Sequence, residues 1–234
     1  MSNSWFRFKQ FNVEQERCPM KVGTDGVLLG AWFPISQGSN VLDIGTGTGL
    51  VALMAAQRGA AHVTAVDIDP DAAWQAGRNA AASVWADRVE VVCRDIAEFD
   101  TTVRFDRIVC NPPFFRDSLR SPDAGRNRAR HNDMLSFETL TMRAASLLAD
   151  DGLFCLVLPY DAVEVFIRCA AAAGLDLCRR TDVLTAPGKT PKRSLVAFGK
   201  NRAVLDTDVL QMCGSDGKET PQYVELVKDF YLKY

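Results

Sequence analysis

Residues that commonly hold metals are scarce in this sequence. It has two histidines, His62 and His131, and its seven cysteines form no C-x-x-C pair. These counts exclude a histidine metal cluster and the usual zinc spacings, and the odd number of cysteines argues against a disulfide framework. We therefore predict no metal site. Cys93, Cys110 and Cys155 lie in apolar runs and are expected to be buried as small hydrophobic residues.

Long apolar segments are also absent. The longest apolar stretch, residues 27–35, is interrupted by Gly30 and Pro34 and falls short of the roughly 18 residues of a membrane span. The opening residues, MSNSWFRFKQF, have no apolar core of the kind found in signal peptides. We expect a cytoplasmic protein without a membrane partner.

Neither charge is in large excess. The 234 residues include 27 Lys or Arg and 29 Asp or Glu, so contact with nucleic acid would have to come from local basic patches. The composition, 47% hydrophobic and 24% charged, is that of a globular domain with a sizeable core. It excludes a disordered chain and a coiled coil.

What the sequence does contain, from Asn40 onward, is an alternation of β-branched runs with alanine-rich stretches. Continuous apolar runs are typical of parallel strands whose sheet is covered on both faces. The predicted strands are 41–45, 62–68, 88–95, 105–113, 151–159, 175–185 and 192–200, and the predicted helices are 49–58, 70–84, 135–149 and 161–173. The fold class is therefore α/β, with a doubly wound, mostly parallel sheet that binds ligands at the carboxyl ends of its strands.

A glycine-rich loop, Asp43-Ile44-Gly45-Thr46-Gly47-Thr48-Gly49, joins the first of these strands to its helix. Glycines at this place permit a tight turn and the close approach of a ligand to the backbone. Leu50 breaks the G-x-G-x-x-G dinucleotide pattern, and the sequence has no G-x-x-x-x-G-K-[ST] phosphate loop. Glycines between a strand and a helix also occur in many α/β proteins as purely structural residues.

The loop resembles the D-x-G-x-G-x-G motif of class I S-adenosylmethionine (SAM) methyltransferases, which have a Rossmann-like fold. This resemblance implies a seven-stranded sheet with an antiparallel last strand, and SAM as the cofactor. It also implies that the cofactor site includes Asp43, Gly45, Thr46, Gly47 and Gly49.

Two further acids end the next strands. Asp67 lies 22 residues after Gly45, where this type of fold presents a carboxylate to a ribose diol, and Asp95 ends the third strand. Each acid alone could be a helix cap or a solvated side chain, but acids on three successive strands suit a cationic nucleoside better than a phosphate. The resemblance to methyltransferases places Asp95 at the adenine amine and adds Ile68 and Ile96 to the cofactor site.

The segment Met20-Lys21-Val22-Gly23-Thr24-Asp25-Gly26 resembles the motif that these enzymes place before their first strand. The resemblance implies that Lys21, Thr24 and Asp25 contact the amino-acid end of SAM. Alternatively, Thr24 and Asp25 simply cap the helix that follows.

The fourth strand runs into Asn111-Pro112-Pro113-Phe114, which resembles the [DNS]-P-P-[YFW] motif of SAM enzymes that methylate a nitrogen conjugated to a π system. The resemblance implies that the Asn111 side-chain oxygen and the Pro112 carbonyl accept the two hydrogens of an exocyclic amine. The prolines, Pro112 and Pro113, would fix the backbone and Phe114 would stack on the base. The structural alternative is a strand-ending turn with a buried phenylalanine.

Three basic clusters indicate contact with RNA, although a charge run can also be simply solvated. Basic residues beside a stacking aromatic suit a flipped nucleotide and its flanking phosphates. Residues 5–11 interleave aromatic and basic side chains, as single-strand nucleic-acid surfaces do. The predicted RNA-contacting residues are Arg7, Lys9, Arg116, Arg120, Arg126, Arg128, Arg130, His131, Lys189, Lys192 and Arg193.

The stretches FKQF (8–11) and RCPMKVGTDGVLLGAW (17–32), with the two motifs above, are similar to the bacterial tRNA(Val) N6-adenosine methyltransferases. The resemblance implies SAM-dependent methylation of the adenosine 3′ of the anticodon, with the anticodon loop of tRNA as partner. An N-P-P-F end is also found in enzymes that act on rRNA guanine, DNA adenine or release-factor glutamine, so these substrates stay open. A non-catalytic module that binds SAM or RNA is an alternative of another class.

The chain is expected to be one domain in effect. Residues 1–39 form an N-terminal segment that contacts substrate and SAM, and residues 40–234 form the methyltransferase domain. Residues 221–234 carry apolar side chains at helical spacing, which predicts an amphipathic helix packed on the sheet or, alternatively, a dimer or RNA contact. The oligomeric state stays open, with a monomer favoured.

Overall fold

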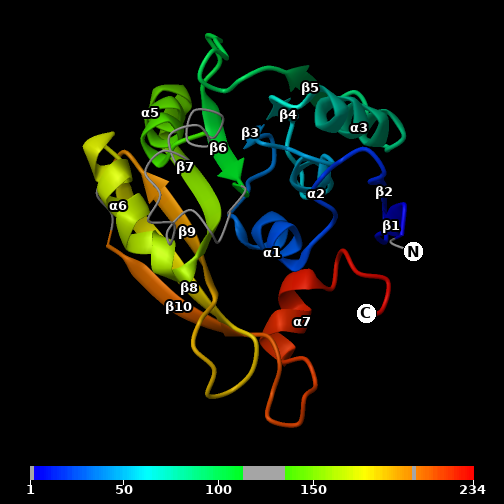
Figure 1. The fold of residues 1–234 in the computed structure, drawn as a ribbon, viewed down its shortest axis with the longest axis vertical. Helices are drawn as coiled ribbons and strands as arrows, with labels where there is room; N and C mark the ends of the chain where they lie inside the picture. The colour runs from blue at the N-terminus through cyan, green and yellow to red at the C-terminus, as the bar shows by residue number, and fades with distance from the viewer. Residues whose placement is uncertain (1–2, 113–134, 202–203) are drawn as a thin grey trace, which may run out of the picture.

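An eight-stranded sheet forms the centre of the molecule, with helices on both of its faces (Figure 1). A computed structural model describes residues 3–112, 135–201 and 204–234. The strand order is β10-β8-β9-β7-β6-β3-β4-β5. The strands are β3 (Asn40–Ile44), β4 (His62–Asp67), β5 (Val89–Cys93), β6 (Phe105–Cys110), β7 (Leu148–Pro159), β8 (Asp176–Leu184), β9 (Arg193–Gly199) and β10 (Asp206–Gln211).

Two buried clusters of side chains fill the spaces between the sheet and its helices. One cluster contains residues of α1, α2, α3 and α7, and the other contains residues of α5 and α6. The helices are α1 (Thr24–Trp32), α2 (Leu50–Gln57), α3 (Pro70–Ala81), α5 (Phe137–Leu147), α6 (Val163–Ala172) and α7 (Pro221–Val227), with a short 3-10 helix at Tyr160–Ala162. Among the described residues, no helix is both long enough and apolar enough to cross a membrane.

The predicted fold class is confirmed, with one strand more than predicted. Strands β7, β6, β3, β4 and β5 are parallel, and β9 is antiparallel to both β7 and β8. The additional strand, β10, pairs in parallel with β8 at the edge of the sheet. Its sequence, DTDVLQ, buries only Leu210, so it lacks the apolar run by which the other strands were predicted.

Proline and capping residues set several boundaries. Strand β6 ends at Cys110 rather than at residue 113, because Pro112 has no N–H for the sheet. Helix α3 begins at Pro70 with the Asp69 side chain accepting the N–H of Asp71, but it ends at Ala81, three residues before the predicted end. The predicted helix 221–234 is likewise helical only over α7.

Of the N-terminal aromatic residues, Phe8 and Phe11 lie in the core, so the comparison with a single-strand nucleic-acid surface is wrong for them, whereas Trp5 is exposed. Phe8 and Phe11 are 1% and 6% exposed, and Phe8 stacks on Tyr231 from the C-terminal segment. Strand β1 (Trp5–Arg7) pairs with β2 (Asn12–Glu14) in a two-stranded sheet beside α3 (Figure 1). Within β1, the period-two alternation directs Phe6 inward and leaves Trp5 and Arg7 exposed.

Two of the three cysteines predicted to be buried are buried. Cys110 and Cys155 lie in the two core clusters. Cys93 is exposed, because it is the last residue of β5, and β5 is an edge strand of the sheet. An apolar run therefore predicted the strand correctly but not the environment of its final residue.

Candidate active site at the carboxyl edge of the sheet

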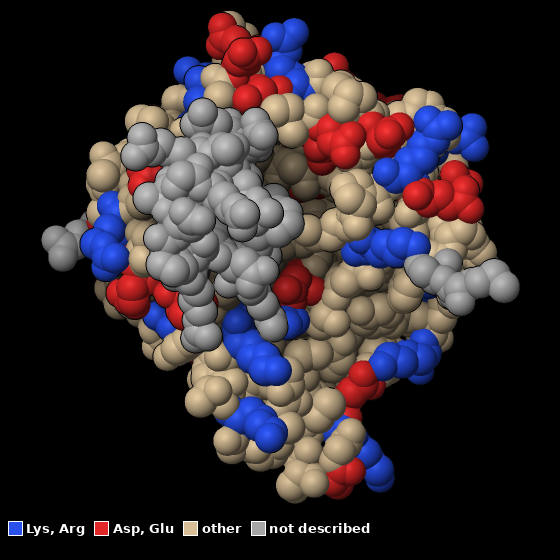
Figure 2. Space-filling view, in the orientation of Figure 1, with Lys and Arg blue, Asp and Glu red and all other residues tan. Residues whose placement is uncertain are grey.

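The polar residues singled out in the sequence follow four adjacent parallel strands. Ile44, at the end of β3, pairs with Val66 of β4 and with Cys110 of β6. Gly45, Asp67, Asp95 and Asn111 therefore lie along one edge of the sheet, as predicted. Figure 2 shows this side of the molecule hollowed near its centre, with acidic side chains along the upper right rim and basic ones lower down.

Asp43 lies beneath the glycine loop and holds it in place. Its side chain is buried, and one carboxylate oxygen accepts the Thr46 hydroxyl at 2.6 Å and the Ala52 N–H at 3.1 Å. Burial raises the pKa of Asp43 from its ordinary value of 3.8 to about 7. Because the Asp43 side chain forms its hydrogen bonds with the loop and the following helix, its part in a cofactor site is to support the backbone.

The three glycines of the loop have different surroundings. Gly45 has φ 68°, and a Cβ there would meet nothing within 4 Å, so its backbone borders open space. Gly49 has φ 81°, and a Cβ there would lie 3.3 Å from Ala76 of α3. Gly45 can therefore face a ligand, whereas Gly49 permits close packing of the loop on a helix.

Asp67 and Asp95 lie at the rim of this edge. The Asp67 carboxylate accepts the N–H of Gly47 at 2.8 Å and that of Asp69 at 3.0 Å, and burial raises its pKa. Asp95 accepts the N–H of Ala97 at 2.9 Å and is half-buried. Each carboxylate keeps further lone pairs for a ligand.

The two isoleucines beside these acids differ. Ile68 is 64% exposed, which is unusual for a large apolar side chain and leaves it available to a planar ring. Ile96 is buried in the α5–α6 cluster, so its side chain does not face the open edge.

Asn111 follows β6 and lies against the first turn of α1. A Cβ added to Gly26 would be 3.9 Å from Asn111 Nδ2 and 3.1 Å from Leu50, so glycine lets α1 approach both the asparagine and the first residue of α2. Pro112 is buried. The other two residues of the motif, Pro113 and Phe114, lie outside the described residues.

The capping alternative for Thr24 and Asp25 is wrong. The N-cap of α1 is Gly23, and no side chain caps the helix. Asp25 instead forms an ion pair with Arg193 at the start of β9. Burial raises the pKa of Asp25, and the guanidinium opposes this shift. Lys21 is exposed at the surface.

The predicted RNA-contacting residues fall into three groups. Arg7, Lys9, Lys189 and Lys192 are exposed, the last two on the loop between β8 and β9. Arg193 is mostly covered and paired with Asp25. The residues that lie outside the described part of the chain are Arg116, Arg120, Arg126, Arg128, Arg130 and His131.

Three residues that support the site were missed in the sequence. Cys18 lies over the loop, with Sγ 3.5 Å from the Cβ position of Gly47. The Asn79 amide donates to the carbonyls of Thr48 and Glu14, both at 2.8 Å, and so ties the loop to β2. The Arg143 guanidinium donates to the Ile96 carbonyl at 3.0 Å beside Asp95. No local pattern marks these residues, because each acts across a large sequence separation.

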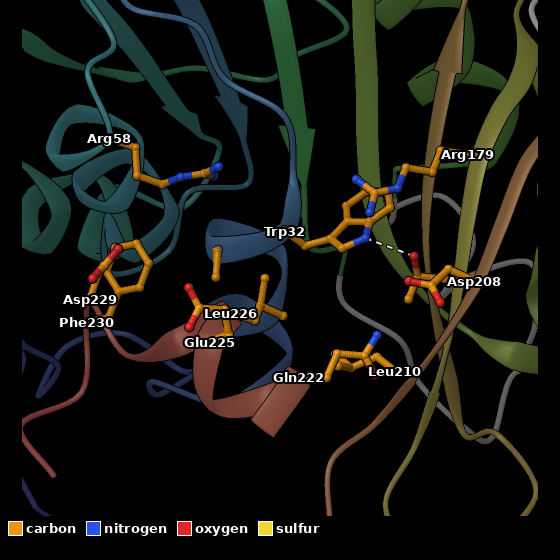
Figure 3. A pocket seen from close by; sticks show the side chains of 12 residues that line it. Trp32, Arg58, Arg179, Asp208, Leu210, Gln222, Glu225, Leu226, Asp229 and Phe230 are labelled. Carbon is orange, nitrogen blue, oxygen red and sulfur yellow. Dashed lines mark hydrogen bonds between the residues drawn. The ribbon is translucent and has the colours of Figure 1, made fainter. Parts of the chain in front are cut away.

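A separate cavity of about 410 Å³ lies between α1, α7 and the β8–β10 end of the sheet (Figure 3). Arg179 lies over the Trp32 ring at 4.6 Å, and the Trp32 indole donates to the Thr181 hydroxyl at 2.9 Å. None of the predicted site residues lines it. The chemistry indicated by the sequence belongs to the carboxyl edge instead.

The residues at the carboxyl edge fit SAM. Open space borders Gly45, half-buried Asp67 and Asp95 offer acceptors, and exposed Ile68 offers an apolar surface. A sulfonium nucleoside has a positive charge, a diol and a planar base, which these groups complement. Among the described residues, no group of three or more His, Cys, Asp or Glu side chains could hold a metal ion.

Residues 21–160 match the family described as "Methyltransferase small domain". Together with the doubly wound sheet and the glycine loop, this match defines the chain as a methyltransferase. It is 49% identical to a tRNA1(Val) (adenine(37)-N6)-methyltransferase from Phocaeicola vulgatus, over 99% of both chains. It is 43% identical to the protein of the same name from Haemophilus influenzae, over 99% of this chain and 100% of that one. The chain thus belongs to the tRNA1(Val) (adenine(37)-N6)-methyltransferase family, which confirms the resemblance identified in the sequence.

Solved structures share the fold. A predicted O-methyltransferase from Agrobacterium tumefaciens matches with a TM-score of 0.68 and 22% identity, over 88% of this chain and 96% of that one. A magnesium protoporphyrin IX methyltransferase from Synechocystis, which contains bound SAM, matches with a TM-score of 0.51 and 17% identity, over 70% and 71%. The methyltransferase class agrees with the cofactor predicted from the glycine loop.

Proposed function

We propose that this protein transfers a methyl group from SAM to the exocyclic N6 amine of adenosine 37 in tRNA(Val), the adenosine 3′ of the anticodon. The observation that carries the proposal is the position of Asn111 and Pro112 at the end of β6, on the same edge as the glycine loop and the acids. The names of the relatives supply the substrate. This substrate also favours the cytoplasm as the location.

Asn111 and Pro112 are proposed to prepare the amine for transfer. The lone pair of an exocyclic amine is delocalised into the ring, which makes the nitrogen a poor nucleophile. The Asn111 Oδ1 atom and the Pro112 carbonyl would accept its two hydrogens and favour a pyramidal nitrogen. SAM supplies, when bound, an electrophilic methyl group on a sulfonium. The nitrogen becomes acidic only after transfer, so positioning and electrostatics are enough and no dedicated base is required.

The cofactor contacts are divided among the strand ends. We assign the ribose hydroxyls to Asp67 and the adenine amine to Asp95, with Ile68 against the ring. The Gly45 and Gly47 backbone would border the amino-acid moiety, and Asp43 with Thr46 would support it from below. The other cofactor residues we propose are Lys21, Thr24, Asp25, Gly49, Asn111 and, through its backbone only, Ile96.

Basic groups on the described surface are proposed to contact the phosphates of the anticodon loop. Lys189 and Lys192 extend from the β8–β9 loop, and Arg7 and Lys9 extend from the N-terminal segment. This assigns substrate contact to residues 1–39 as well as to residues 40–234. The six basic residues of the 116–131 segment named above complete the set.

The experiment is methylation of unmodified tRNA(Val) by the purified protein, followed by nucleoside mass spectrometry. We expect N6-methyladenosine with wild-type tRNA and none with adenosine 37 replaced by guanosine. We also expect none from Asn111→Ala, whose SAM binding should be nearly intact because the other cofactor contacts remain. Full activity of Asn111→Ala would overturn the mechanism. Assays with rRNA, DNA and release factor in the same preparation distinguish the other conjugated amines. RNA binding without turnover on any substrate would instead favour the non-catalytic module.

A further inference from the structure

Tyr160 lies at the carboxyl edge, directly after β7, the strand next to β6. Strand β7 pairs in parallel with β6, and Leu156 is opposite Cys110, the residue before Asn111. The chain then continues to Pro159, opposite Arg193 of β9, and Tyr160 follows. Its side chain is 41% exposed, which is high for a large ring at the end of a central strand.

The Tyr160 ring is held rather than loosely exposed. Its backbone N–H donates to the Lys192 carbonyl at 3.2 Å, which ties it to the β8–β9 loop. The Arg180 guanidinium lies over the ring, 5.1 Å from its centroid. Arg180 is only 19% exposed, so it supports the ring from the protein side.

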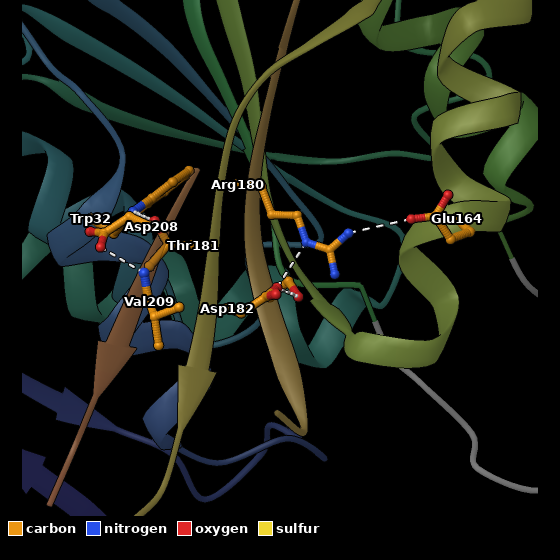
Figure 4. A network of polar contacts seen from close by, with 8 residues as sticks. Trp32, Glu164, Arg180, Thr181, Asp182, Asp208 and Val209 are labelled. Carbon is orange, nitrogen blue, oxygen red and sulfur yellow. Dashed lines mark hydrogen bonds and ion pairs between the residues drawn. The ribbon is translucent and has the colours of Figure 1, made fainter. Parts of the chain in front are cut away.

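Arg180 is itself fixed by two acids (Figure 4). Its Nε donates to Asp182 Oδ1 at 2.8 Å, and its Nη1 lies 3.3 Å from Glu164 of α6. The Ser194 hydroxyl also donates to Asp182 Oδ1, at 2.5 Å. The side chains behind Tyr160 are therefore fixed before any ligand arrives, and little order has to be gained when one binds.

A second exposed aromatic residue, Trp74 on α3, provides a contrast. It is 46% exposed, and the Arg17 guanidinium lies 4.1 Å from its ring centroid. However, Arg17 pairs with Asp71, and Asp69 caps the same helix. Arg78 also lies over the Trp74 ring and pairs with Glu14. Both arginines at Trp74 are thus paired with acids, whereas Tyr160 adjoins the loop that carries exposed Lys189 and Lys192. Trp5 is also exposed and lies near Arg7, but it belongs to the separate β1–β2 sheet. Among the described residues, Tyr160 is the exposed ring that directly follows the strand paired with β6 and adjoins exposed lysines that can meet phosphates.

We propose that Tyr160 is a stacking platform for the nucleobase adjacent to the methylated adenosine, and that Lys189 and Lys192 contact the phosphates beside it. The inference rests on the proposed function. Turning the target adenosine out of the anticodon loop removes a stacking partner from its neighbour. The Tyr160 ring, supported by Arg180, replaces that partner at the entrance to the site.

The test is a cycle between the protein and the RNA. Tyr160→Ala should lower kcat/KM for the tRNA by about 5- to 150-fold, which corresponds to the stacking of one base on an aromatic ring. SAM affinity should not change, and Tyr160→Phe should keep most of the activity. For the wild type, an abasic site at one of the two positions 36 and 38 of an anticodon stem-loop should lower kcat/KM by a similar factor. For Tyr160→Ala, the same abasic site should lower kcat/KM little further, because the stacking partner of that base is already absent.

The controls separate failure of this inference from failure of the proposed function. Trp74→Ala removes another aromatic ring of similar exposure that arginines also contact, and it should leave kcat/KM for the tRNA unchanged. If the wild type methylates no tRNA, the proposed function fails. If the wild type methylates tRNA(Val) and Tyr160→Ala is equally active, the platform is overturned. The platform would also be overturned if each abasic site lowered kcat/KM by the same factor in Tyr160→Ala as in the wild type.

Discussion

The carboxyl edge of the sheet has an acidic half and a basic half, and the two hold their charges differently. At the ends of β3 and β4, Asp43 and Asp67 accept hydrogen bonds from the glycine loop, and Asp43 is buried while Asp67 is half-buried. Beyond β8, Lys189 and Lys192 extend into solvent from a loop. Asn111 directly follows β6, which lies between the two halves in the strand order.

The difference corresponds to two kinds of ligand. A small cationic cofactor gains most from a few acceptors in fixed positions, and buried carboxylates act strongly in a low dielectric. A polyanion is attracted by exposed cations over a distance, and that attraction is screened by salt. Variants of the acidic half should therefore change SAM binding alone, and variants of the basic half should change RNA binding alone.

The largest effect is expected from the pH dependence of stability at Asp43. Its folded pKa of about 7 lies above the ordinary 3.8, so its contribution is complete below about pH 4 and is lost as the pH rises to 7. Between pH 4 and pH 8, the wild type should therefore lose on the order of 4 kcal/mol of its free energy of unfolding through Asp43. The Asp43→Asn variant has no ionisable group there and should not show this loss. Denaturant titrations at several pH values measure this. Parallel curves for the two proteins would mean that Asp43 ionises normally.

The next effect is expected at Asp67, the acid assigned to the ribose. Asp67→Ala removes an ionised acceptor, worth about 1.5–3 kcal/mol, and should raise the SAM dissociation constant about 10- to 150-fold. Calorimetric titration with SAM measures it. Asp69→Ala is the matched control, because Asp69 caps α3 with its side chain and should affect helix stability more than SAM affinity. An equal loss of SAM affinity in the two variants would show that Asp67 does not hold the ribose.

A smaller effect is expected where the two halves meet. Arg193→Met leaves Asp25 without its ion pair, so burial alone acts on that carboxyl and its pKa rises further. Since both side chains are partly exposed, the loss of the ion pair should lower the free energy of unfolding by about 0.5–1 kcal/mol. We expect the KM values for SAM and for tRNA to rise together by a few-fold. A change confined to one substrate would show that the pair does not join the halves.

The smallest effect is expected from the basic loop. Lys189→Ala and Lys192→Ala should each weaken tRNA binding a few-fold at moderate salt and leave SAM binding unchanged. Each should also reduce the slope of log K against log salt by roughly 0.7–0.9, because one phosphate contact is lost. Binding titrations from low to high salt measure the slope. An unchanged slope in both variants would remove this loop from the RNA surface.

The acidic half could be predicted from the sequence because its information is local. The glycines and Asp43 lie within seven consecutive residues, and Asp67, Asp95 and Asn111 each lie at or just beyond the end of a clear apolar run. Supporting residues could not be predicted in this way. Arg143 and Arg180 act through contacts with distant elements that only the folded chain brings together.

A local sequence pattern was misleading where the same alternation of residue types is found in two different environments. Alternating aromatic and basic residues fit both a nucleic-acid surface and a half-buried hairpin, and burial of Phe8 and Phe11 decides for the hairpin. Strand β10 was missed for the opposite reason. An edge strand with one buried side chain has almost no hydrophobic period to detect.

The packing of Phe8 on Tyr231 has a kinetic consequence. The Lys9 N–H also donates to the Phe230 carbonyl at 2.8 Å, so segments from opposite ends of the printed sequence meet in one aromatic cluster. Contacts between such distant residues close very large loops and add to contact order, which slows folding. The cluster should therefore assemble after the central strands, and its amides should exchange hydrogen through a local opening that leaves the sheet intact.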